Sequence, residues 1–311
     1  MPELPEVETV RRGLERRAVG RTIRAVEILN SWIIQGDSPV FRRRLEGRWI
    51  SSVRRKGKSL ALELLSQNGE PPAYLLVRLG MTGQLTVSPR QAPLLLHTHV
   101  RIALDEGREE LRYRDPRRFG MLRCCTTAEL DEAFDRLGPD ALKITLQQFK
   151  EALHGHSGAI KGWLLNQQML AGLGNIYADE ALFDSRIHPQ TPAGALSHPA
   201  SRALHRAVQK VLHRAVTLQG TTFRDYVDID GNPGNFEPRL SAYRRTNQPC
   251  PRCGKPIRRI IVCGRSSHFC PRCQPRPVRT APLGSPRGRF ASRPAPAAHS
   301  HSRPASYSSP S

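Results

Sequence analysis

The spacing of apolar residues at the start of this 311-residue chain predicts a leading helix. Within residues 1–20, Val7, Val10 and Leu14 recur at intervals of three and four residues, the period of a helix with one apolar face. Pro5 suits the first helical turn, where its missing N–H is not needed. We therefore expect a helix that packs its apolar face on a core.

The next region, residues 21–125, consists of short β-rich or alternating runs that are typical of strands. Turn-forming pairs such as Asn68-Gly69 and Asp115-Pro116 separate the runs. The pattern predicts a β-sandwich or a barrel-like sheet. The predicted strands lie in TIRAVEIL, SLALEL, AYLLVRL, HVRIAL and GMLRCC.

From about residue 127 the apolar period becomes helical, so we predict an α+β multidomain protein. The expected helices are 127–137, 145–154, 160–170, 176–186 and 198–218. The rest of the chain is rich in loops up to residue 249, and Pro, Ser, Ala and Arg dominate after the last cysteine, which predicts disorder. The expected domains are 1–125, 126–249, a metal module at 250–273 and a disordered basic tail at 274–311.

The net charge of +21 predicts a polyanionic partner, of which nucleic acid is the commonest. From Gln274 onward there are six arginines and no acid, so the preceding residues keep +15 and the body itself is basic. No apolar run approaches the ~20 residues of a membrane span, and the start lacks the basic and apolar segments of a signal peptide. We expect a soluble cytoplasmic protein.

Four of the seven cysteines form a metal-binding pattern. Two CxxC pairs, 16 residues apart, can place their sulfurs around one tetrahedral zinc ion. Four thiolates leave no open position, so the ion is expected to be structural. The intervening residues predict a hairpin whose tip carries Arg265, suited to a phosphate, and Cys263, expected to be a packing residue. The expected ligands are Cys250, Cys253, Cys270 and Cys273.

Pro2 is a candidate nucleophile, because methionine before proline is normally removed and leaves a secondary amine. An α-amino group has a pKa near 8, against about 10.4 for lysine, so far more of it is neutral at pH 7. A following helix start disfavours the ammonium further, and Glu3 lies beside it to exchange protons. An ordinary helix start explains the same two residues.

The chain resembles the bacterial formamidopyrimidine-DNA glycosylases, beginning with MPELPEVETVRRGL. The similarity runs in order through residues 1–273. It implies an N-terminal β-sandwich with a leading helix, a helical domain with a helix–two-turn–helix element, and a four-cysteine zinc finger. Its further motifs are RLGMTGQL (78–85), LHTHV (96–100), RYRDPRRFG (112–120), AIKGWLLNQQMLAGLGNIYADEALF (159–183) and GTTFRDY (220–226).

The resemblance implies a bifunctional DNA glycosylase and abasic-site lyase that acts on duplex DNA with oxidised purines or abasic sites. Pro2 would form the Schiff base, Glu3 would shuttle protons, Lys58 would assist β-elimination, and Arg265 would grip the phosphates that flank the lesion. A monomer in the bacterial cytoplasm, associated with the nucleoid, is expected. The implied DNA-contacting residues are Met81, His97, Arg117, Phe119, His156, Lys161, Asn175 and Arg265.

Simpler roles exist for these side chains. Met81 and Phe119 could be core residues, Arg117 could pair with Asp115, and Lys58 could be one more solvated lysine. His97 and His99 could be structural. Two other classes also remain open: an endonuclease VIII-type glycosylase for oxidised pyrimidines, and a non-enzymatic zinc-finger regulator.

Three residues depart from the family pattern. Gly162 stands where proline is frequent, Arg244 where glycine is common, and Asn235 where an aromatic residue is often found. The last two lie in or beside segment 221–244, which includes the loop expected to cover the extruded base. Lesion preference is therefore the property that these departures affect.

Overall fold

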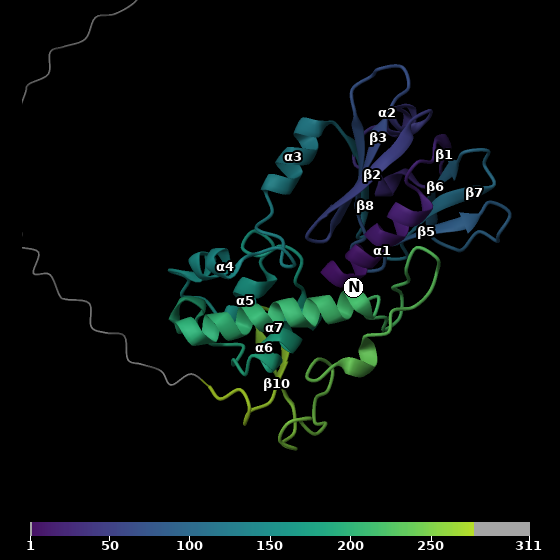
Figure 1. Cartoon of the computed structure of the whole chain (residues 1–311). Coiled ribbons are helices and arrows are strands. Elements are labelled where there is room, and N and C mark those ends of the chain that lie inside the picture. The colour runs from purple at the N-terminus through teal and green to yellow at the C-terminus, as the bar shows by residue number, and fades with distance from the viewer. Residues whose placement is uncertain (1, 277–311) are drawn as a thin grey trace, which may run out of the picture. The chain divides into compact units, whose positions relative to one another are not determined.

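Strands between Ile23 and Cys125 form two four-stranded antiparallel sheets in the computed structural model, which describes residues 2–276 (Figure 1). One sheet has the order β1-β6-β7-β5 and the other β2-β3-β4-β8. Met1 and residues 277–311, which hold most of the predicted tail, lie outside the described residues. The strands are β1 (Ile23–Ile28), β2 (Trp49–Lys56), β3 (Ser59–Leu65), β4 (Ala73–Arg78), β5 (Gln84–Pro89), β6 (Thr98–Leu104), β7 (Glu109–Arg114) and β8 (Met121–Cys125).

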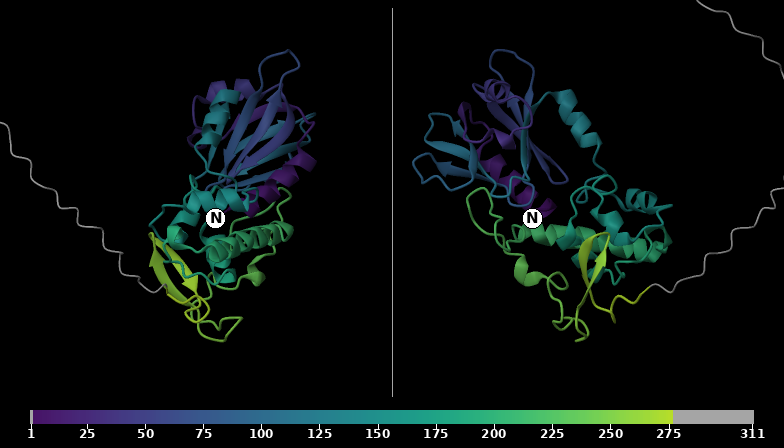
Figure 2. Two further views of the ribbon diagram at one scale, coloured as in Figure 1. Left: turned by 60° about the vertical axis from the view of Figure 1, so that its left-hand side comes forward. Right: turned by 180° about the vertical axis from the view of Figure 1, so that it is seen from behind.

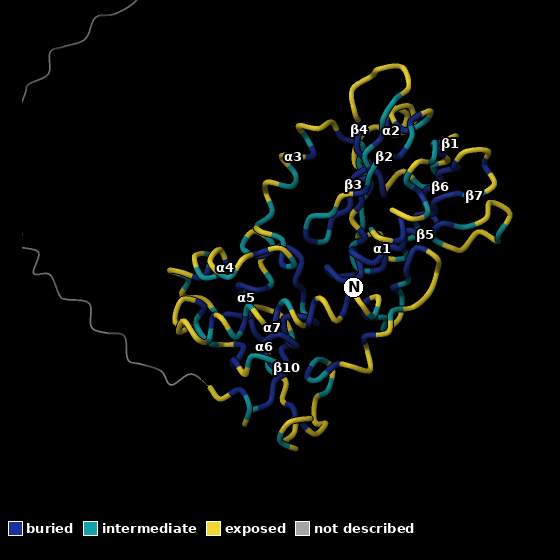
Figure 3. Tube along the Cα trace, in the orientation of Figure 1, coloured by how far each residue is buried: buried dark blue, intermediate teal, exposed yellow. Residues whose placement is uncertain are grey.

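The sheets confirm the predicted strands and add three, β2, β5 and β7, that the sequence did not single out. Strand β7 has the sequence EELRYR and lies between β6 and β5 in its sheet. Its four charged residues are untypical of a central strand, which is why the sequence did not reveal it. Glu110 and Arg112 are buried there, because the guanidinium donates to the carboxylate over 2.6 Å and to the carbonyls of a neighbouring loop. Pairing makes this burial tolerable. Buried residues follow the strands, while exposed ones gather on the connecting loops (Figure 3).

Helix α1 (Leu4–Arg17) joins two hydrophobic cores. Val7, Val10 and Leu14 are buried in the core of the sheets, as the spacing predicted. Leu4 belongs instead to the core of the helical region. The Glu3 N–H donates to the Glu6 carboxylate over 2.7 Å, which completes a capping box at the start of the helix. The chain start is therefore fixed between the two cores.

Five of the remaining helices follow the sequence prediction. Helix α5 is shorter than expected, because residues 166–174 form the turns that lead into α6 rather than a helical extension. Helix α2 was missed, since its run of arginines masks the apolar pair Phe41 and Leu45. The helices are α2 (Ser38–Leu45), α3 (Thr127–Asp135), α4 (Leu146–Leu153), α5 (Ile160–Leu165), α6 (Asn175–Asp184) and α7 (His198–Thr217), with single 3₁₀ turns at Ser31–Ile33, Ala193–Ala195 and Glu237–Arg239.

The predicted hairpin of the cysteine module is formed by β9 (Arg258–Val262) and β10 (Arg265–Phe269). Its base packs against α6 through a small core of Phe183, Ala242 and Ile257 together with the cysteines. Helix α6 lies between α7 and the hairpin, as the two further views show (Figure 2). Within residues 2–276, no helix is long and apolar enough to cross a membrane.

Candidate active site

A cleft of 510 Å³ brings together residues that are far apart in the sequence. It lies where α1, the β2–β3 turn, the start of α6, segment 221–244 and the zinc hairpin meet. Six of the residues expected to act on DNA or on the lesion line it: Glu3, Lys58, Met81, Arg117, Asn175 and Arg265. Its lining also includes Arg244, one of the departures from the family pattern.

Glu3 is fixed by the first turn of α6. Its carboxylate accepts hydrogen bonds from the N–H groups of Gly174 over 2.7 Å and Ile176 over 3.0 Å. Burial raises the pKa of Glu3, while nearby Lys58 and these N–H groups oppose the rise. Pro2 is buried directly before it. The carboxyl can thus hold or release a proton next to the chain's first amine after Met1 is removed.

Glu6 is a second buried carboxyl beneath the site, and the sequence did not reveal it. It accepts from the N–H groups of Glu3 and Thr221, each over 2.7 Å, and from the Tyr177 hydroxyl. Burial, and then the adjacent Glu3 charge, raise its pKa to about 7. The sequence showed Glu6 only as a residue of a helix start. Its partners Tyr177 and Thr221 are about 170 and 215 residues away from it along the chain.

Lys58 lies in the turn between β2 and β3 and reaches the cleft. Burial lowers its pKa, whereas the charges of Glu3 and Glu6 act in the opposite direction. A raised carboxyl pKa beside a lowered ammonium pKa brings the two groups closer to exchanging a proton. Lys58 is therefore not a solvated lysine of a basic strand.

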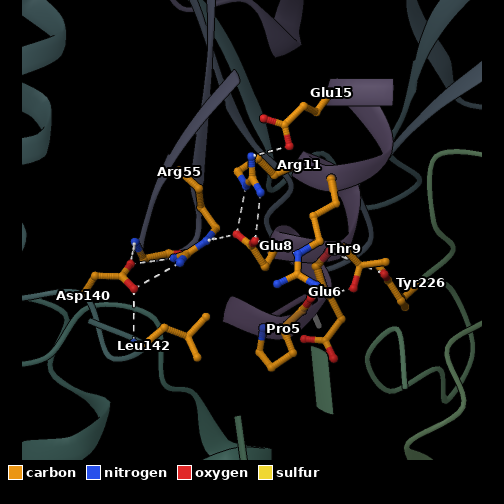
Figure 4. Close-up of polar contacts among 12 residues, drawn as sticks. Pro5, Glu6, Glu8, Thr9, Arg11, Glu15, Arg55, Asp140, Leu142 and Tyr226 are labelled. Atoms are coloured by element: carbon orange, nitrogen blue, oxygen red, sulfur yellow. Dashed lines mark hydrogen bonds and ion pairs between the residues drawn. The ribbon is translucent and has the colours of Figure 1, made fainter. Parts of the chain in front are cut away.

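A buried ion network holds the turn that carries Lys58 (Figure 4). Arg55, with only 3% of its side chain exposed, donates to Glu8 over 2.9 Å and to both Asp140 oxygens over 2.5 and 3.0 Å. Asp140 also accepts from the Gly57 N–H over 2.8 Å. Buried ion pairs of this kind hold a defined geometry. Removal of one charged side chain leaves its partner buried and unpaired, which is strongly destabilising. Sequence reasoning missed Arg55 and Asp140, which are 85 residues apart.

The zinc hairpin presents Arg265, which is exposed, to the cleft. Beneath it, Lys161 is fully buried and donates to Asp179 over 2.6 Å and to the Ser266 carbonyl over 2.7 Å. Asp179 in turn accepts from the His268 N–H and contacts its ring, each at 2.9 Å. Lys161 therefore lies below the hairpin with its ammonium already bonded, and not on the DNA-facing surface where the resemblance placed it.

Met81, Arg117 and Phe119 come from two neighbouring loops beside the cleft. Phe119 is 58% exposed, so it is not a core residue. The Arg117 guanidinium lies over its ring, 4.7 Å from the centroid, and not against Asp115. Asp115 is buried and accepts from Thr82 and from the Gly120 N–H. The bonds of Asp115 therefore fix the loop on its buried side, while the side chains of Arg117 and Phe119 point outward.

Segment 221–244 is tied to α1 and to the sheets. Its Arg244 has φ +60, which explains why glycine is common at this position. The guanidinium lies 4.2 Å from the centroid of the Phe223 ring, and both line the cleft. The backbone N–H of Asn235 donates to the Leu218 carbonyl over 2.8 Å. This bond does not depend on the side chain, so the segment stays attached to the end of α7 without the aromatic residue.

The remaining expectations for histidine and cysteine have mixed outcomes. His97 has φ +68, and neither it nor His156 lines the cleft within the described residues. His99 is buried against the Asp115 carbonyl at 2.8 Å, a structural role. Cys263 lies outside the four-cysteine cluster, so it is not a fifth ligand, but it is exposed in the hairpin turn and not packed in a core. A Cβ at position 162 would lie 2.6 Å from its sulfur, so Gly162 and Cys263 fit together.

The four predicted cysteines fit one metal ion. Their sulfurs all lie within 4.8 Å of one another, with Cys250 to Cys273 at 3.9 Å and Cys253 to Cys270 at 3.4 Å. Sulfurs at about 2.3 Å from a tetrahedral zinc ion would be about 3.8 Å apart. The N–H groups of Arg252 and Cys273 point at two of the sulfurs, as donors to thiolates do. The zinc site is structural, because all four positions are taken.

Taken together, a sandwich and a helical domain around a basic cleft, with a zinc hairpin at its edge, define the class of helix–two-turn–helix DNA glycosylases. Family models match most of the described residues. They are the "Formamidopyrimidine-DNA glycosylase N-terminal domain" over residues 1–122, the "Formamidopyrimidine-DNA glycosylase H2TH domain" over 137–227, and the "Zinc finger found in FPG and IleRS" over 247–276. The chain belongs to the formamidopyrimidine-DNA glycosylase family.

Named relatives agree. The formamidopyrimidine-DNA glycosylase of Symbiobacterium thermophilum is 46% identical over 286 residues, covering 90% of this chain and 92% of that protein. The one from Herpetosiphon aurantiacus is 44% identical, covering 88% and 100%. A Lactococcus lactis FPG variant bound to Fapy-dG-containing DNA has 33% identity and a TM-score of 0.82, covering 88% of this chain and 100% of that one. A complex of the Lactococcus lactis Fpg with abasic-site DNA has a TM-score of 0.81.

Proposed function

We propose that the cleft beside Glu3 carries out both steps of a bifunctional DNA glycosylase and abasic-site lyase, with Pro2 as the nucleophile. The chain is an enzyme for oxidised purines in DNA and acts on damaged or abasic duplexes, in keeping with its family and the DNA-bound relatives. Membership of this family decides against the non-enzymatic regulator and against the pyrimidine enzyme. The observation that carries the residue assignment is the convergence of Glu3, Lys58 and Arg265 on one cleft.

In the first step the neutral Pro2 nitrogen attacks C1′ of the damaged nucleotide, and the bond from C1′ to the base breaks with its electron pair. The base must leave the helix stack to be reached. Glu3, whose pKa is raised by burial, gives and takes the proton that this exchange needs. The attached nitrogen then gives up its proton, the C1′–O4′ bond breaks, and O4′ takes up a proton. The nitrogen's electron pair forms the C=N bond, so the product is an iminium between Pro2 and the opened sugar.

In the second step the iminium acidifies the C2′–H. Loss of that proton expels the 3′ phosphate, and a second elimination expels the 5′ phosphate. Lys58, with its lowered pKa and its place beside Glu3, serves the β-elimination. Arg265 and Asn175 hold the flanking phosphates, since an exposed guanidinium and a side-chain amide that lines the cleft can both donate to such anions.

Met81, Arg117 and Phe119 fill the space that the extruded base leaves. Phe119 is exposed enough to enter the stack, and Arg117 beside it can pair with the orphan base. His97 and His156 contact the DNA backbone at a distance from the cleft. Lys161 acts through the hairpin that it supports and not by touching phosphate.

Domain boundaries and cellular place complete the proposal. The catalytic sandwich spans 1–125, the helical domain with the capping segment 126–249, and the zinc finger 250–273, with the basic tail beyond. The relatives named above are bacterial, and we place this enzyme in the cytoplasm on nucleoid DNA, acting as a monomer.

Borohydride trapping on abasic DNA tests the nucleophile directly. The mature protein should become covalently linked to DNA through Pro2. A form with verified retention of Met1 should lose both trapping and excision, and Pro2→Gly should lose most of its base excision. Undiminished trapping that maps to an internal lysine would contradict the assignment. Excision of 8-oxoguanine should exceed that of thymine glycol.

A further inference from the structure

Helix α7 carries a row of cations and no carboxylate. Arg202, Arg206, Lys210 and Arg214 recur every four residues along its 20-residue length, and all four are exposed. Residues four apart lie next to each other on a helix surface, so the row runs along one side of it over about 18 Å. The opposite side is the buried one, formed by residues such as Leu204, Val208 and Leu212.

The charges of this row are largely uncompensated. Lys210 pairs with Asp184 over 3.0 Å. Among residues 2–276, the guanidiniums of Arg202, Arg206 and Arg214 have no carboxylate within ion-pair distance. The row is therefore a concentrated source of positive potential.

Two further cations extend the row beyond the helix. Lys210 and Arg214 share the wall of a 230 Å³ hollow with Arg239 and with Arg252 of the zinc module. Arg252 is held in place by the carbonyls of Phe183 and Asp184, at 2.6 and 3.1 Å, and it shares the Asp184 carboxylate, at 3.2 Å, with Lys210. The six side chains form one surface, which we call the α7 basic row: Arg202, Arg206, Lys210, Arg214, Arg239 and Arg252.

The α7 basic row is separate from the cleft. Helix α6 packs on α7 and on β10, with the hairpin on the other side of α6 (Figures 1 and 2). Asp184, which meets Lys210, ends α6, whereas Asn175 at its start lines the cleft. A duplex held by Arg265 and Asn175 would leave the row free.

We propose that the α7 basic row binds a second segment of duplex DNA while the cleft holds the first. The charge complementarity, the length of the row and the absence of acids on α7 fit a phosphate backbone, which is read without regard to sequence. Such a surface lets the enzyme pass directly from one DNA segment to another. The inference rests on the DNA-repair function but not on the assignment of Pro2 or Glu3.

The experiment measures transfer with the full-length chain. The enzyme is bound to a labelled duplex with an uncleavable abasic analogue, and its dissociation is followed as unlabelled undamaged duplex is added. Direct transfer makes the dissociation rate of the wild type rise with competitor concentration. The triple variant Arg202→Gln, Arg206→Gln, Arg214→Gln should reduce this dependence on the order of tenfold, since three phosphate contacts are lost, while dissociation without competitor stays unchanged.

A charge-matched variant, Arg42→Gln, Arg43→Gln, Arg44→Gln on α2, serves as the control, because these residues are also exposed and lie on the sheet domain. It should behave as the wild type. Glutamine is close to arginine in helix propensity, so both variants should fold, and 8-oxoguanine excision on the same preparations should be retained by both. Loss of excision in the wild type itself would count against the proposed function and not against the row.

Equal competitor dependence in the α7 variant and the wild type would overturn the proposal. So would an equal loss in the α2 control, since net charge and not this surface would then explain the effect. Acceleration by poly-L-glutamate at equal charge concentration, without acceleration by duplex, would assign the row to an acidic protein partner instead. The basic tail is common to all three proteins and cancels in the comparison.

Discussion

The carboxylate of Glu3 is bonded to the backbone N–H of Gly174 over 2.7 Å, across 171 residues of sequence. The residue that precedes α1 thus closes the start of α6. Because the partner is backbone, the position of the proposed proton shuttle depends on how closely two chain segments approach. Gly174 permits that approach, since a Cβ there would lie 2.4 Å from the Glu3 carboxyl carbon.

Gly174→Ala should therefore impair chemistry more than binding. The added methyl displaces the Glu3 carboxyl, and a misplacement of about 1 Å can cost about 10²-fold in rate. We expect single-turnover excision of 8-oxoguanine to fall by about that factor, with affinity for an uncleavable abasic analogue within a few fold of wild type. Gly158→Ala, where an added Cβ meets nothing within 4 Å, is the control. Unchanged excision in Gly174→Ala would contradict this account of Glu3.

Arg55→Lys should slow strand cleavage more than Schiff-base formation. Lysine keeps the charge but cannot donate to Glu8 and both Asp140 oxygens together, so the turn that carries Lys58 loses its support. On a preformed abasic site we expect the ratio of trapped intermediate to cleaved product to rise about tenfold. Arg54→Lys, at an exposed neighbouring position, should leave the ratio unchanged. A parallel fall in trapping and cleavage would point to a purely structural role for Arg55.

Glu6 should make the protein less stable as the pH rises toward 7. Its folded-state pKa of about 7 lies above the ordinary value of 4.5, so the folded state binds the proton more tightly than the unfolded state. The stability from this group is fully present below pH 4.5 and is lost as the pH rises through 7. Denaturant unfolding between pH 5 and 8 should show a loss of about 1–3 kcal/mol in the wild type that is absent in Glu6→Gln. If the free energy of unfolding changed with pH equally in the wild type and in Glu6→Gln, this role of Glu6 would be contradicted.

Removal of zinc should weaken DNA binding and lower the melting temperature. Chelation leaves four thiols where one ion held the base of the hairpin, so Arg265 loses its fixed position. We expect abasic-DNA affinity to fall on the order of tenfold or more and to recover when zinc is restored. Cys253→Ser should lose bound zinc by atomic absorption, whereas Cys263→Ser should retain one ion per chain, because Cys263 lies outside the cluster.

Local spacing predicted much of this fold, and the successes have a common reason. Val7, Val10 and Leu14 act through a repeat within one helix, and the four cysteines through a short repeat within one module. The missed elements carry charge where the pattern calls for apolar residues. Strand β7 can bury Glu110 because Arg112 and Arg101 pair with it. The alternation of apolar and polar residues along a strand does not predict such pairs.

The candidate site shows the same division. Glu3 and Arg265 were reached from their motifs, but Glu6, Arg55 and Asp140 were not, because their roles come from partners on distant segments. Lys161 and Cys263 were misplaced. The family resemblance alone placed Lys161 among the DNA contacts, and a cysteine beside a zinc module suggests packing. In the structure Lys161 is buried against Asp179, and Cys263 is exposed in its turn.

Helix α6 is bonded at both ends. Glu3 closes its first turn, and Arg252 of the zinc module holds the carbonyls of Phe183 and Asp184 at its last turn. With ten residues, or about 15 Å, the helix connects the metal module at one end to the carboxylate of Glu3 at the other. If Glu3 is the proton shuttle that we propose, a change in the zinc module should shift its carboxyl, and we expect the rate of base excision to follow metal occupancy.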